Sequence, residues 1–572
     1  MRLQIVNSKN AQSFYVVKST YKNKKRSNKV VEKLGTLEEI KIKAGDSDPV
    51  QWAKDYVKKL NEEEKNGTRK ILIKYDPQKI ISKDSNVFFN CGYLFLEKIY
   101  NQLELDKICE KISKKYKFEY DLSNILSRLL FSRIIYPSSK LATCELSKKY
   151  IEQPNFKLHE IYRALEIIAK ENNFIQSETY KNSAKVVKRN TNILYYDCTN
   201  YFFEIEQQNG LKQYGPSKEH RPNPIVQMGL FMDGDGIPLA FDITKGNESE
   251  QETLQPIEDR IAKDFECSKF IVCTDAGLSS IKNRKFNNIK DRAFITTQSI
   301  KKLKKYLKEW ALEKTGWHIS GESKIYDISM FDNNESATKE FFNKVFYKER
   351  WINDDGLEQK LIVTFSLKYQ NYQKKIREEQ IERAKKMIND QSVKLDKCGP
   401  NDCRRFIKKI CVTKEGEVAS NKEFSLNDEV IAREEKFDGF YGVCTNLNDS
   451  PEDIIKVNQK RWEIEESFRI MKSEFKARPV YLQRDDRIIA HFVTCFLSLI
   501  LFRLLEKKLD EKYTCNEIVD CLRNMNLLES PDNGYIPAYT RTDLTDKLHE
   551  IFGFRTDYEI LNNKTIKIFL KN

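Results

Sequence analysis

The stretch Ile193-Leu-Tyr-Tyr-Asp-Cys-Thr-Asn-Tyr-Phe-Phe-Glu204 has the β-branched and aromatic content of a central β-strand, with Asp197 in its middle. Burying a carboxylate is costly unless the group is paired or bound to a metal. The stretch therefore predicts a strand that carries a functional acid. The alternative for this residue alone is a structural, hydrogen-bonded aspartate.

The sequence that follows predicts the rest of a sheet. Two further strands, Val226–Met232 and Ile237–Ile243, flank the turn signal Asp233-Gly-Asp-Gly236. A helix from about Glu252 to Lys263 leads to Phe270-Ile-Val-Cys-Thr-Asp275, a buried strand that ends in an acid. Strand, hairpin, helix and strand in this order predict a mixed α/β sheet of the ribonuclease-H type.

A third acid lies in the run Val457-Asn-Gln-Lys-Arg-Trp-Glu-Ile-Glu-Glu-Ser-Phe-Arg-Ile-Met-Lys472, which predicts one amphipathic helix. At about 100° per residue, one stripe holds four polar residues and borders an apolar arc of Val457, Ile464, Phe468 and Met471. The stripe consists of Asn458, Arg461, Glu465 and Lys472.

This stripe predicts that Glu465 is half-buried between two cations, whereas Glu463 and Glu466 project away from it. The alternative is a surface helix in which Arg461 and Glu465 form an ordinary i,i+4 ion pair worth a few tenths of a kcal/mol.

The charge balance favours a polyanionic partner. The chain has 572 residues, with 99 Lys+Arg against 85 Asp+Glu and a net charge of +14. Nucleic acid is the first candidate, and the alternative is that the lysines reflect genome composition. The apolar stretch Ile488–Leu505 contains His491 and Arg503, so we expect a buried core helix and no membrane span.

The thirteen cysteines include no C-x-x-C pair, and Met1 opens directly into sequence typical of a folded domain. A reduced cytoplasm is the expected location. Cys398, Cys403 and Cys411 lack the paired spacing of a zinc site, so we expect inert thiols.

Changes in composition and in the spacing of apolar residues along the chain predict six segments. A β-rich basic N-terminal unit has predicted strands at 13–18, 30–34 and 71–75 and a basic turn at 21–27. A helical domain for DNA binding or dimerisation follows, with a plain helical spacer as the alternative. The core is then split by an inserted subdomain that holds Trp310, Trp317 and Trp351 and a predicted helix at 369–388. The core resumes with a strand at 440–445. The segments are 1–85 (β-rich), 86–190 (helical), 191–300 (first core part), 301–435 (insertion), 436–515 (second core part) and 516–572 (C-terminal tail).

Asp197, Asp275 and Glu465 together are hard oxygen ligands of the kind that two Mg²⁺ ions need for an in-line phosphoryl displacement. Each acid alone is weakly specific. Three of them on these elements and in this order predict a two-metal site.

With these residues in place, the chain resembles the DDE transposases of bacterial insertion sequences. It is similar to the insertion-sequence-four superfamily, whose third acid lies in a Y-x2-R-x3-E-x6-K signature. The signature here reads Asn458-x2-Arg461-x3-Glu465-x6-Lys472, with asparagine in place of tyrosine. The pattern is closest to the insertion-sequence-1634-like group over about 90–505. Further similarity lies in Gly215-Pro-Ser-Lys218, Gln227-Met-Gly-Leu230, Gly236-Ile-Pro-Leu239, Gly246-Asn247 and Arg478-Pro-Val-Tyr481.

The resemblance implies that Asp197, Asp275 and Glu465 are the catalytic, metal-binding residues, holding two Mg²⁺ ions with Mn²⁺ as a substitute. It implies that Arg461 and Lys472 hold phosphates of the element end. Asn458 in the signature, and His220 and Arg221 on a basic loop, are further candidate DNA contacts. One tryptophan of the insertion would stack on a displaced base; a place in the core is the alternative for each.

The implied enzyme is a Mg²⁺-dependent polynucleotidyl transferase. It would cleave double-stranded DNA at terminal inverted repeats, release a 3′-hydroxyl and join it to target DNA, as a homodimer in the complex. It would be cytoplasmic in a bacterium, associated with the nucleoid when bound. The alternatives are a nuclease of the ribonuclease-H fold, or a transposase-derived DNA-binding protein whose chemistry is unused.

Overall fold

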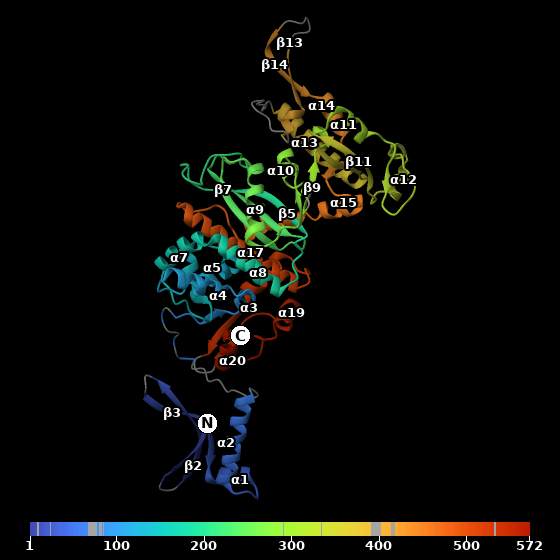
Figure 1. Cartoon of the computed structure of the whole chain (residues 1–572). Helices are drawn as coiled ribbons and strands as arrows, with labels where there is room; N and C mark the ends of the chain where they lie inside the picture. Colours follow the sequence, from blue (N-terminus) through green and yellow to red (C-terminus); the bar gives the residue numbers. More distant parts are fainter. Residues whose placement is uncertain are drawn as a thin grey trace. The chain divides into compact units, whose positions relative to one another are not determined.

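The backbone divides into two units, which are described separately. The structure is a computed structural model that describes residues 1–8, 11–22, 25–66, 77, 78, 80, 83, 85–289, 291–332, 334–390, 402–412, 418–530 and 534–571. One unit consists of Met1–Ser85 with Ser530–Gly534, and the other of Asn86–Glu529 with Tyr535–Asn572 (Figure 1). The strand expected at 71–75, residues 23 and 24 of the basic turn, and Cys398 lie outside the described residues.

The N-terminal unit is a three-stranded antiparallel sheet packed on two helices. The strands β1 (Arg2–Asn7), β2 (Gln12–Lys22) and β3 (Lys25–Thr36) lie in that order, so the strands expected at 13–18 and 30–34 are present. Thr36 caps α1 (Leu37–Ala44), and α2 (Pro49–Asn66) follows. Phe14 and Val16 of the sheet pack against Ile40 and Val57 of the helices, which forms a small separate core.

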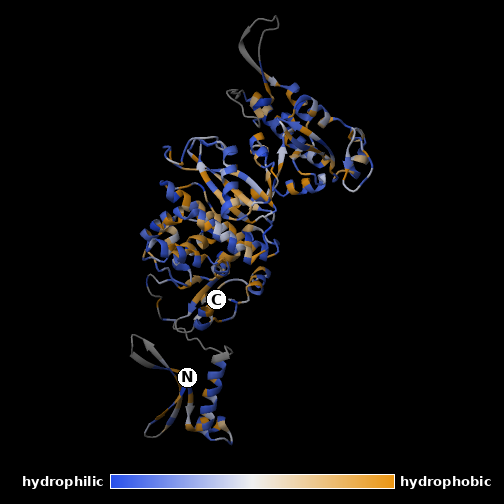
Figure 2. Cartoon of the chain, in the orientation of Figure 1, coloured by the Kyte–Doolittle hydropathy of each residue, from blue (hydrophilic) through white to orange (hydrophobic). Residues whose placement is uncertain are grey.

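Helices dominate the first part of the larger unit, as expected from the apolar spacing. After β4 (Phe88–Asn90) they pack around the long helix α17 (Asp485–Lys508), and Figure 2 shows hydrophobic residues concentrated there. The remaining helices of this part are α3 (Tyr93–Gln102), α4 (Leu105–Tyr116), α5 (Leu122–Ile135), α6 (Lys140–Leu146), η1 (Ser147–Lys149), α7 (Leu158–Lys170) and α8 (Asn172–Val186).

A mixed nine-stranded sheet forms the centre of the larger unit, in the order β10-β11-β12-β15-β9-β8-β5-β6-β7. β5 pairs antiparallel with β6 and parallel with β8. The expected order of strand, hairpin, helix and strand is therefore present, and the mixed α/β class is confirmed. The elements are β5 (Ile193–Phe202), β6 (Ile225–Asp233), β7 (Pro238–Lys245), η2 (Glu250–Glu252), α9 (Leu254–Asp264), β8 (Phe270–Thr274), α10 (Ile281–Phe286) and β9 (Arg292–Gln298).

The two faces of the sheet have different coverings because successive side chains of a strand point to opposite faces. Leu194, Tyr196 and Cys198 of β5 belong to the core that α9 closes. Tyr195 and Tyr201 belong to the core shared with α17 and the helical part. The odd-numbered residues of β5 therefore face the side on which the chain's C-terminal helices lie.

The expected insertion contributes strands to the same sheet. β10 (His318–Ile319), β11 (Phe346–Asp354) and β12 (Leu357–Phe365) extend it, and β15 (Phe440–Thr445) returns between β12 and β9. Its other elements are η3 (Ile300–Lys302), α11 (Lys305–Leu312), η4 (Ile328–Phe331), α12 (Glu335–Glu340), α13 (Leu367–Asn389), η5 (Cys403–Phe406), β13 (Ile407–Val412), β14 (Val418–Leu426) and α14 (Asp428–Glu435).

The C-terminal part consists of helices and short strands, as expected. In the described residues one helix, α17, is long and apolar enough to cross a membrane, and 94% of its apolar window is buried inside the protein. It is therefore a core helix, as its sequence indicates. The elements beside it are α15 (Pro451–Gln459), α16 (Trp462–Arg469), η6 (Ile470–Glu474), α18 (Cys515–Asn524), β16 (Asn526–Ser530), β17 (Gly534–Pro537), α19 (Asp543–Phe552) and α20 (Asn563–Lys571).

The cysteines whose pairing the structure describes are all free, in accord with a reduced protein. Of the three cysteines considered for zinc, Cys403 lies 3.8 Å from the sulfur of Met387, Sγ to Sδ.

Candidate active site

Asp197 lies in the middle of β5, on the face that carries Tyr195 and Tyr201. The Tyr195 hydroxyl donates to the carbonyl of Val457 at 3.0 Å, which ties this face of β5 to α15. The carboxylate of Asp197 is partly buried, and its Oδ1 accepts from the backbone N–H of Cys198 at 2.8 Å. The sheet thus turns the first acid toward the segment that carries the third.

Asp275 follows the last residue of β8 directly. Tyr195 pairs with Cys273 in the parallel ladder of β5 and β8, so the same register continued by two residues puts Asp275 level with Asp197. The Asp275 Oδ1 accepts from the backbone N–H of Leu278 at 2.9 Å, which closes the turn after the strand. Neighbouring parallel strands therefore bring the first two acids together, as the sequence predicts.

Burial raises the pKa of Asp197 to about 6, and the carboxylate of Asp275 adds to this rise. The cations of Lys218 and Arg461 act in the opposite direction. Two carboxylates that oppose each other's ionisation are stabilised together by added positive charge. This pair therefore has the electrostatics of a cation site.

The segment with the third acid is not the single helix that its periodicity indicates. α15 ends at Gln459, α16 begins at Trp462, and a π-helical turn, η6, runs from Ile470 to Glu474. The apolar arc is nevertheless buried, with Ile464, Phe468 and Met471 in the core. Periodicity predicted this buried side but not the interruption of the helix at Lys460 and Arg461.

Glu465 is more exposed than the sequence predicts, because 64% of its side chain is accessible. Its Oε1 lies 3.7 Å from Nη2 of Arg461, which is the i,i+4 pair considered as the alternative. The carboxylate oxygens of Asp197, Asp275 and Glu465 do not form a group with all ligand atoms within 4.8 Å. The structure therefore unites the two aspartates and leaves Glu465 beside them, held by Arg461.

The neighbouring glutamates are separated from Glu465 as expected. Glu466 pairs with Arg503 of α17 at 3.3 Å and with Arg469 at 3.2 Å. Burial raises the pKa of Glu463, which also lies within the field of Lys507. Glu466 therefore contacts α17, the carboxylate of Glu463 lies against Gly236, and Glu465 faces Arg461.

Arg461 connects the acids. Burial alone would lower its pKa, but the surrounding groups raise it, with Asp197 and Asp275 among them. Its Nη1 donates to the hydroxyl of Thr297 at 3.4 Å, and its buried Nε has no hydrogen-bond partner among the described residues. The guanidinium therefore lies within the field of all three acids and keeps an unused donor.

Asn458, considered as a DNA contact, is only 5% exposed. Its amide nitrogen donates to the hydroxyl of Tyr441 at 3.0 Å, and its oxygen accepts from Thr297 at 3.5 Å. The side chain is thus occupied inside the protein, where it joins α15 to β15 and β9. The helical periodicity placed Asn458 on the polar stripe, but it could not show that the sheet covers the end of the stripe at which Asn458 lies.

Lys472 contacts the first acidic strand. Its Nζ donates to the hydroxyl of Thr199 at 2.5 Å and lies 5.5 Å from the ring centre of Tyr201. Burial and the charge of Lys218 lower the pKa of Lys472 to about 8, and Asp197 acts against this fall. The signature cation therefore reaches the strand of Asp197 and does not pair with Glu465.

Lys218 also lies beside Asp197, although it was not among the site residues predicted from the sequence. Its Nζ donates to the carbonyl of Cys198, next to Asp197, and lies 3.2 Å from Oε1 of Glu250. Burial would lower its pKa, but Asp197 and Glu250 raise it. The signal was present in the motif Gly215-Pro-Ser-Lys218, although nothing in the sequence placed its lysine beside the acid.

His220 and Arg221 lie on the exposed loop after Lys218. The Arg221 guanidinium stacks over the ring of Phe202 at 4.2 Å, and its Nε lies 3.7 Å from Glu219. Glu219 also pairs with Arg478, beyond the third-acid segment. The loop therefore borders the site, but His220 and Arg221 do not touch the acids in any contact found in the described residues.

The tryptophans of the insertion have different surroundings. Trp317 is fully buried, which matches the core alternative. Trp310 is partly buried, and Lys348 and Arg350 lie 5.0 and 5.2 Å from its ring centre. Trp351 is 44% exposed, so it retains an accessible aromatic face.

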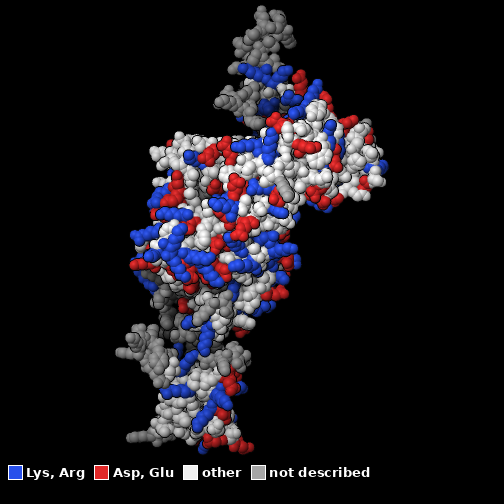
Figure 3. Space-filling model, in the orientation of Figure 1, with Lys and Arg blue, Asp and Glu red and all other residues white. Residues whose placement is uncertain are grey.

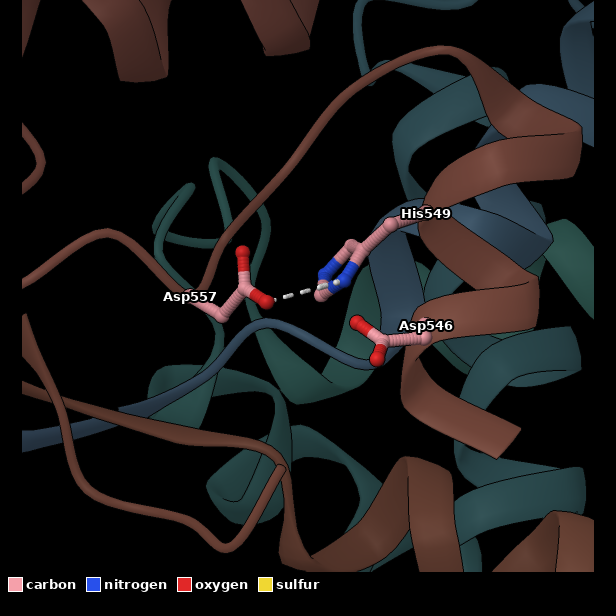
Figure 4. A group of neighbouring side chains, drawn as sticks. All are labelled: Asp546, His549 and Asp557. Atoms are coloured by element: carbon pink, nitrogen blue, oxygen red, sulfur yellow. Dashed lines mark ion pairs between the residues drawn. The ribbon is translucent and has the colours of Figure 1, made fainter. Parts of the chain in front are cut away.

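A second group of possible metal ligands lies in the C-terminal part. Asp546, His549 and Asp557 have ligand atoms within 4.8 Å of one another (Figure 4). Arg555 pairs with both carboxylates at 2.6 Å, and Arg541 lies 2.8 Å from Asp546. Two guanidiniums thus already balance the two carboxylates, and the group is an ion-pair network that closes the end of α19.

The transposase DDE domain family matches residues 202–501, which include Asp275 and Glu465 and begin just after Asp197. No curated protein matches the chain. A solved structure of a piggyBac transposase synaptic complex with hairpin DNA has a TM-score of 0.34 and 8% identity, over 84% of each chain. The family match covers more than half of the sequence, and the chain belongs to the transposase DDE domain family.

Proposed function

We propose that this protein is a metal-dependent DNA transposase that cleaves DNA at the ends of a mobile element and joins the released 3′-hydroxyl to target DNA. The observation that carries the proposal is the pairing of Asp197 and Asp275 on neighbouring strands, with Arg461 and Lys472 beside them. Carboxylates for metal ions next to cations for phosphates are the combination that phosphodiester chemistry needs.

We propose that the site binds two divalent cations, Mg²⁺ first and Mn²⁺ as a substitute, and the two neighbouring aspartates support this. Asp197 and Asp275 offer hard oxygen donors side by side, and burial together with their mutual repulsion raises the pKa of Asp197 to about 6. Bound metal would supply a nucleophile at neutral pH and stabilise the leaving oxygen. Glu465 is the proposed third ligand, which requires that its carboxylate leave Arg461.

The cations of the site bind and orient DNA. Arg461 and Lys472 would contact non-bridging phosphate oxygens, and the unused Nε of Arg461 is a donor available for this. Fixed donors beside the reacting phosphate act most strongly in a partly buried site, where water screens them least. Arg221 extends the cationic edge along the exposed loop, and His220 beside it is a further candidate DNA contact.

The location of the site, and not the overall charge, supports DNA as the substrate. On the face drawn in Figure 3, basic and acidic side chains are interspersed over the larger unit, so the net charge of +14 does not by itself locate a binding surface. The three cations near Asp197, which are Lys218, Arg461 and Lys472, support a DNA-binding surface at this site. Double-stranded DNA with terminal inverted repeats is the proposed substrate, and pairing two ends requires at least a dimer during the reaction.

The proposal extends to the fold of the core, the superfamily, the cellular location and the segments of the chain. The core would be ribonuclease-H-like, since β5, β6 and β7 run antiparallel and β8 and β9 follow in parallel beside β5. The chain would belong to the insertion-sequence-four superfamily, in the insertion-sequence-1634-like group, and act in a bacterial cytoplasm. The six-segment division remains a prediction, with helices 86–190 serving DNA binding or dimerisation.

The test uses the purified chain with Mg²⁺ and a labelled duplex that carries the terminal repeat bordering the gene. Cleavage at the 3′ end followed by joining to a target duplex supports the proposal. Cleavage without joining supports a ribonuclease-H-fold nuclease instead. Specific binding without cleavage, in Mg²⁺ or Mn²⁺, supports a DNA-binding protein with unused chemistry, and either result overturns the proposal.

A further inference from the structure

Lys218 is the cation of the site to which neither the signature nor the family match gives a role. It lies on the loop between β5 and β6, close to Asp197, with its side chain 43% exposed. Its ammonium contacts the carbonyl of Cys198 on one side and Glu250 on another. The ammonium therefore remains partly accessible to a ligand.

The loop that carries Lys218 is built into the sheet. Gly215 packs so closely on Gly246 that a Cβ at position 215 would collide with the carbonyl oxygen of Gly246. The amide of Asn200 donates to the carbonyl of Pro216 at 3.2 Å. The Ser217 hydroxyl accepts from the backbone N–H groups of Glu219 and Arg221, each at 3.3 Å. These contacts orient Lys218 toward the acid strand.

Lys218 and Lys472 approach the same strand from two sides. Lys218 contacts the carbonyl of Cys198, and Lys472 contacts the hydroxyl of Thr199, so the two cations flank the residues that directly follow Asp197. The charge of Lys218 disfavours the ammonium form of Lys472. Two lysines that repel each other beside a carboxylate are an arrangement that a bound anion stabilises.

We propose that Lys218 is a third phosphate-binding residue of the active site, which clamps the reacting phosphate together with Lys472 and which Glu250 holds in place before DNA binds. The ligand chemistry is a phosphodiester of the DNA backbone. This inference rests on the proposed function, since it assigns Lys218 to the substrate of the same site.

The contact with Glu250 explains how the lysine is kept in place. Nζ of Lys218 lies 3.2 Å from Oε1 of Glu250, whose side chain is 30% exposed. A phosphate that approaches Lys218 would share its ammonium with Glu250, because an ammonium has three donors. Loss of the Glu250 charge should therefore leave Lys218 present but less well oriented.

The first test compares DNA binding by the wild-type chain, Lys218→Ala, Lys218→Arg and the control Lys245→Ala, using the terminal-repeat duplex over a range of salt concentrations. Lys245 is exposed at the end of strand β7. Its substitution by alanine removes the same charge as Lys218→Ala. Lys218→Ala should reduce the slope of log affinity against log salt by about 0.9, the value for one phosphate contact. Lys218→Arg should restore the slope, and Lys245→Ala should leave it unchanged.

The second test measures Mn²⁺ binding to the DNA-free chain by calorimetry. Removal of a cation beside Asp197 should tighten Mn²⁺ binding in Lys218→Ala, whereas a merely structural loss would weaken it. Cleavage should fall on the order of 100-fold in Lys218→Ala and severalfold in Glu250→Gln.

The outcomes separate the two proposals. Failure of the wild-type chain to cleave overturns the proposed function. A wild-type chain that cleaves, together with a Lys218→Ala variant that keeps the full salt slope and cleavage rate, overturns the role of Lys218 alone. So does weaker Mn²⁺ binding in Lys218→Ala.

Discussion

Nη2 of Arg461 lies 3.7 Å from Oε1 of Glu465, and the same guanidinium lies within the field of Asp197 and Asp275. Arg461 is 12% exposed, whereas Glu465 is 64% exposed. The arginine is therefore enclosed by the protein, whereas the glutamate faces solvent. If Glu465 is the third metal ligand, as we propose, its carboxylate must leave Arg461.

The substitution Glu465→Gln should abolish cleavage and joining while DNA binding changes little. The amide keeps the shape of the side chain but loses the charge that a divalent cation requires. Gel analysis of labelled end DNA in Mg²⁺ measures the loss. Glu452→Gln, on the exposed first turn of α15, is the matched control and should cleave normally. Mg²⁺-dependent nicking by Glu465→Gln would reject the role of the third acid.

The substitution Arg461→Ala should weaken the DNA complex and lower the slope of its salt dependence by about 0.9. A phosphate contact is lost, and the carboxylates that Arg461 now stabilises repel the DNA backbone more strongly. Filter binding at several salt concentrations measures both effects. An unchanged slope would argue that Arg461 only positions the acids.

The substitution Asp197→Asn should stabilise the chain in the presence of a chelator at neutral pH. Because burial and Asp275 raise the pKa of Asp197 to about 6, ionisation destabilises the folded state above that pH. The gain should be about 1–3 kcal/mol above pH 6 and should vanish as the pH falls from 6 toward 4.

Denaturant unfolding at a series of pH values checks this dependence. Asp510→Asn, at an exposed position after α17, reports the effect of the same substitution without burial. A gain for Asp197→Asn that did not change with pH would show that the carboxylate is not the cause.

DNA binding should take up a proton at weakly alkaline pH. Burial and Lys218 lower the pKa of Lys472 to about 8, so part of the population is neutral between about pH 8 and 9. A bound phosphate favours the ammonium form, so binding draws in a proton. Calorimetric titration in two buffers of different ionisation enthalpy measures the uptake. Lys472→Arg should show none, because guanidinium stays charged.

The substitution Gly215→Ala should destabilise the larger unit by about 1–3 kcal/mol and reduce cleavage. The added Cβ would collide with the carbonyl oxygen of Gly246 and displace the loop that carries Lys218. Thermal unfolding and cleavage assays measure the two effects. Wild-type stability and activity in this variant would show that the loop tolerates the displacement.

Local sequence was sufficient for the strands of the core that carry or precede the first two acids. The content of Ile193–Phe202 predicted β5, and the stretch that ends at Thr274 predicted β8, because strand composition and turn residues act over a few positions. The burial of Ile464, Phe468 and Met471 also follows from periodicity alone. Local patterns also placed the three acids, whereas the roles of Arg461 and Lys472 were implied by the resemblance to the DDE transposases.

The sequence by itself determined which residue types this protein brings to its site and on which strands the first two acids lie. Only the tertiary structure decided which of them meet. It interrupted the helix at Lys460 and Arg461, exposed Glu465, covered Asn458 with the sheet and placed Lys218 next to Asp197. The spacing of apolar residues predicts which side of a single helix or strand is buried. These contacts instead arise from the packing of segments that are far apart in the chain.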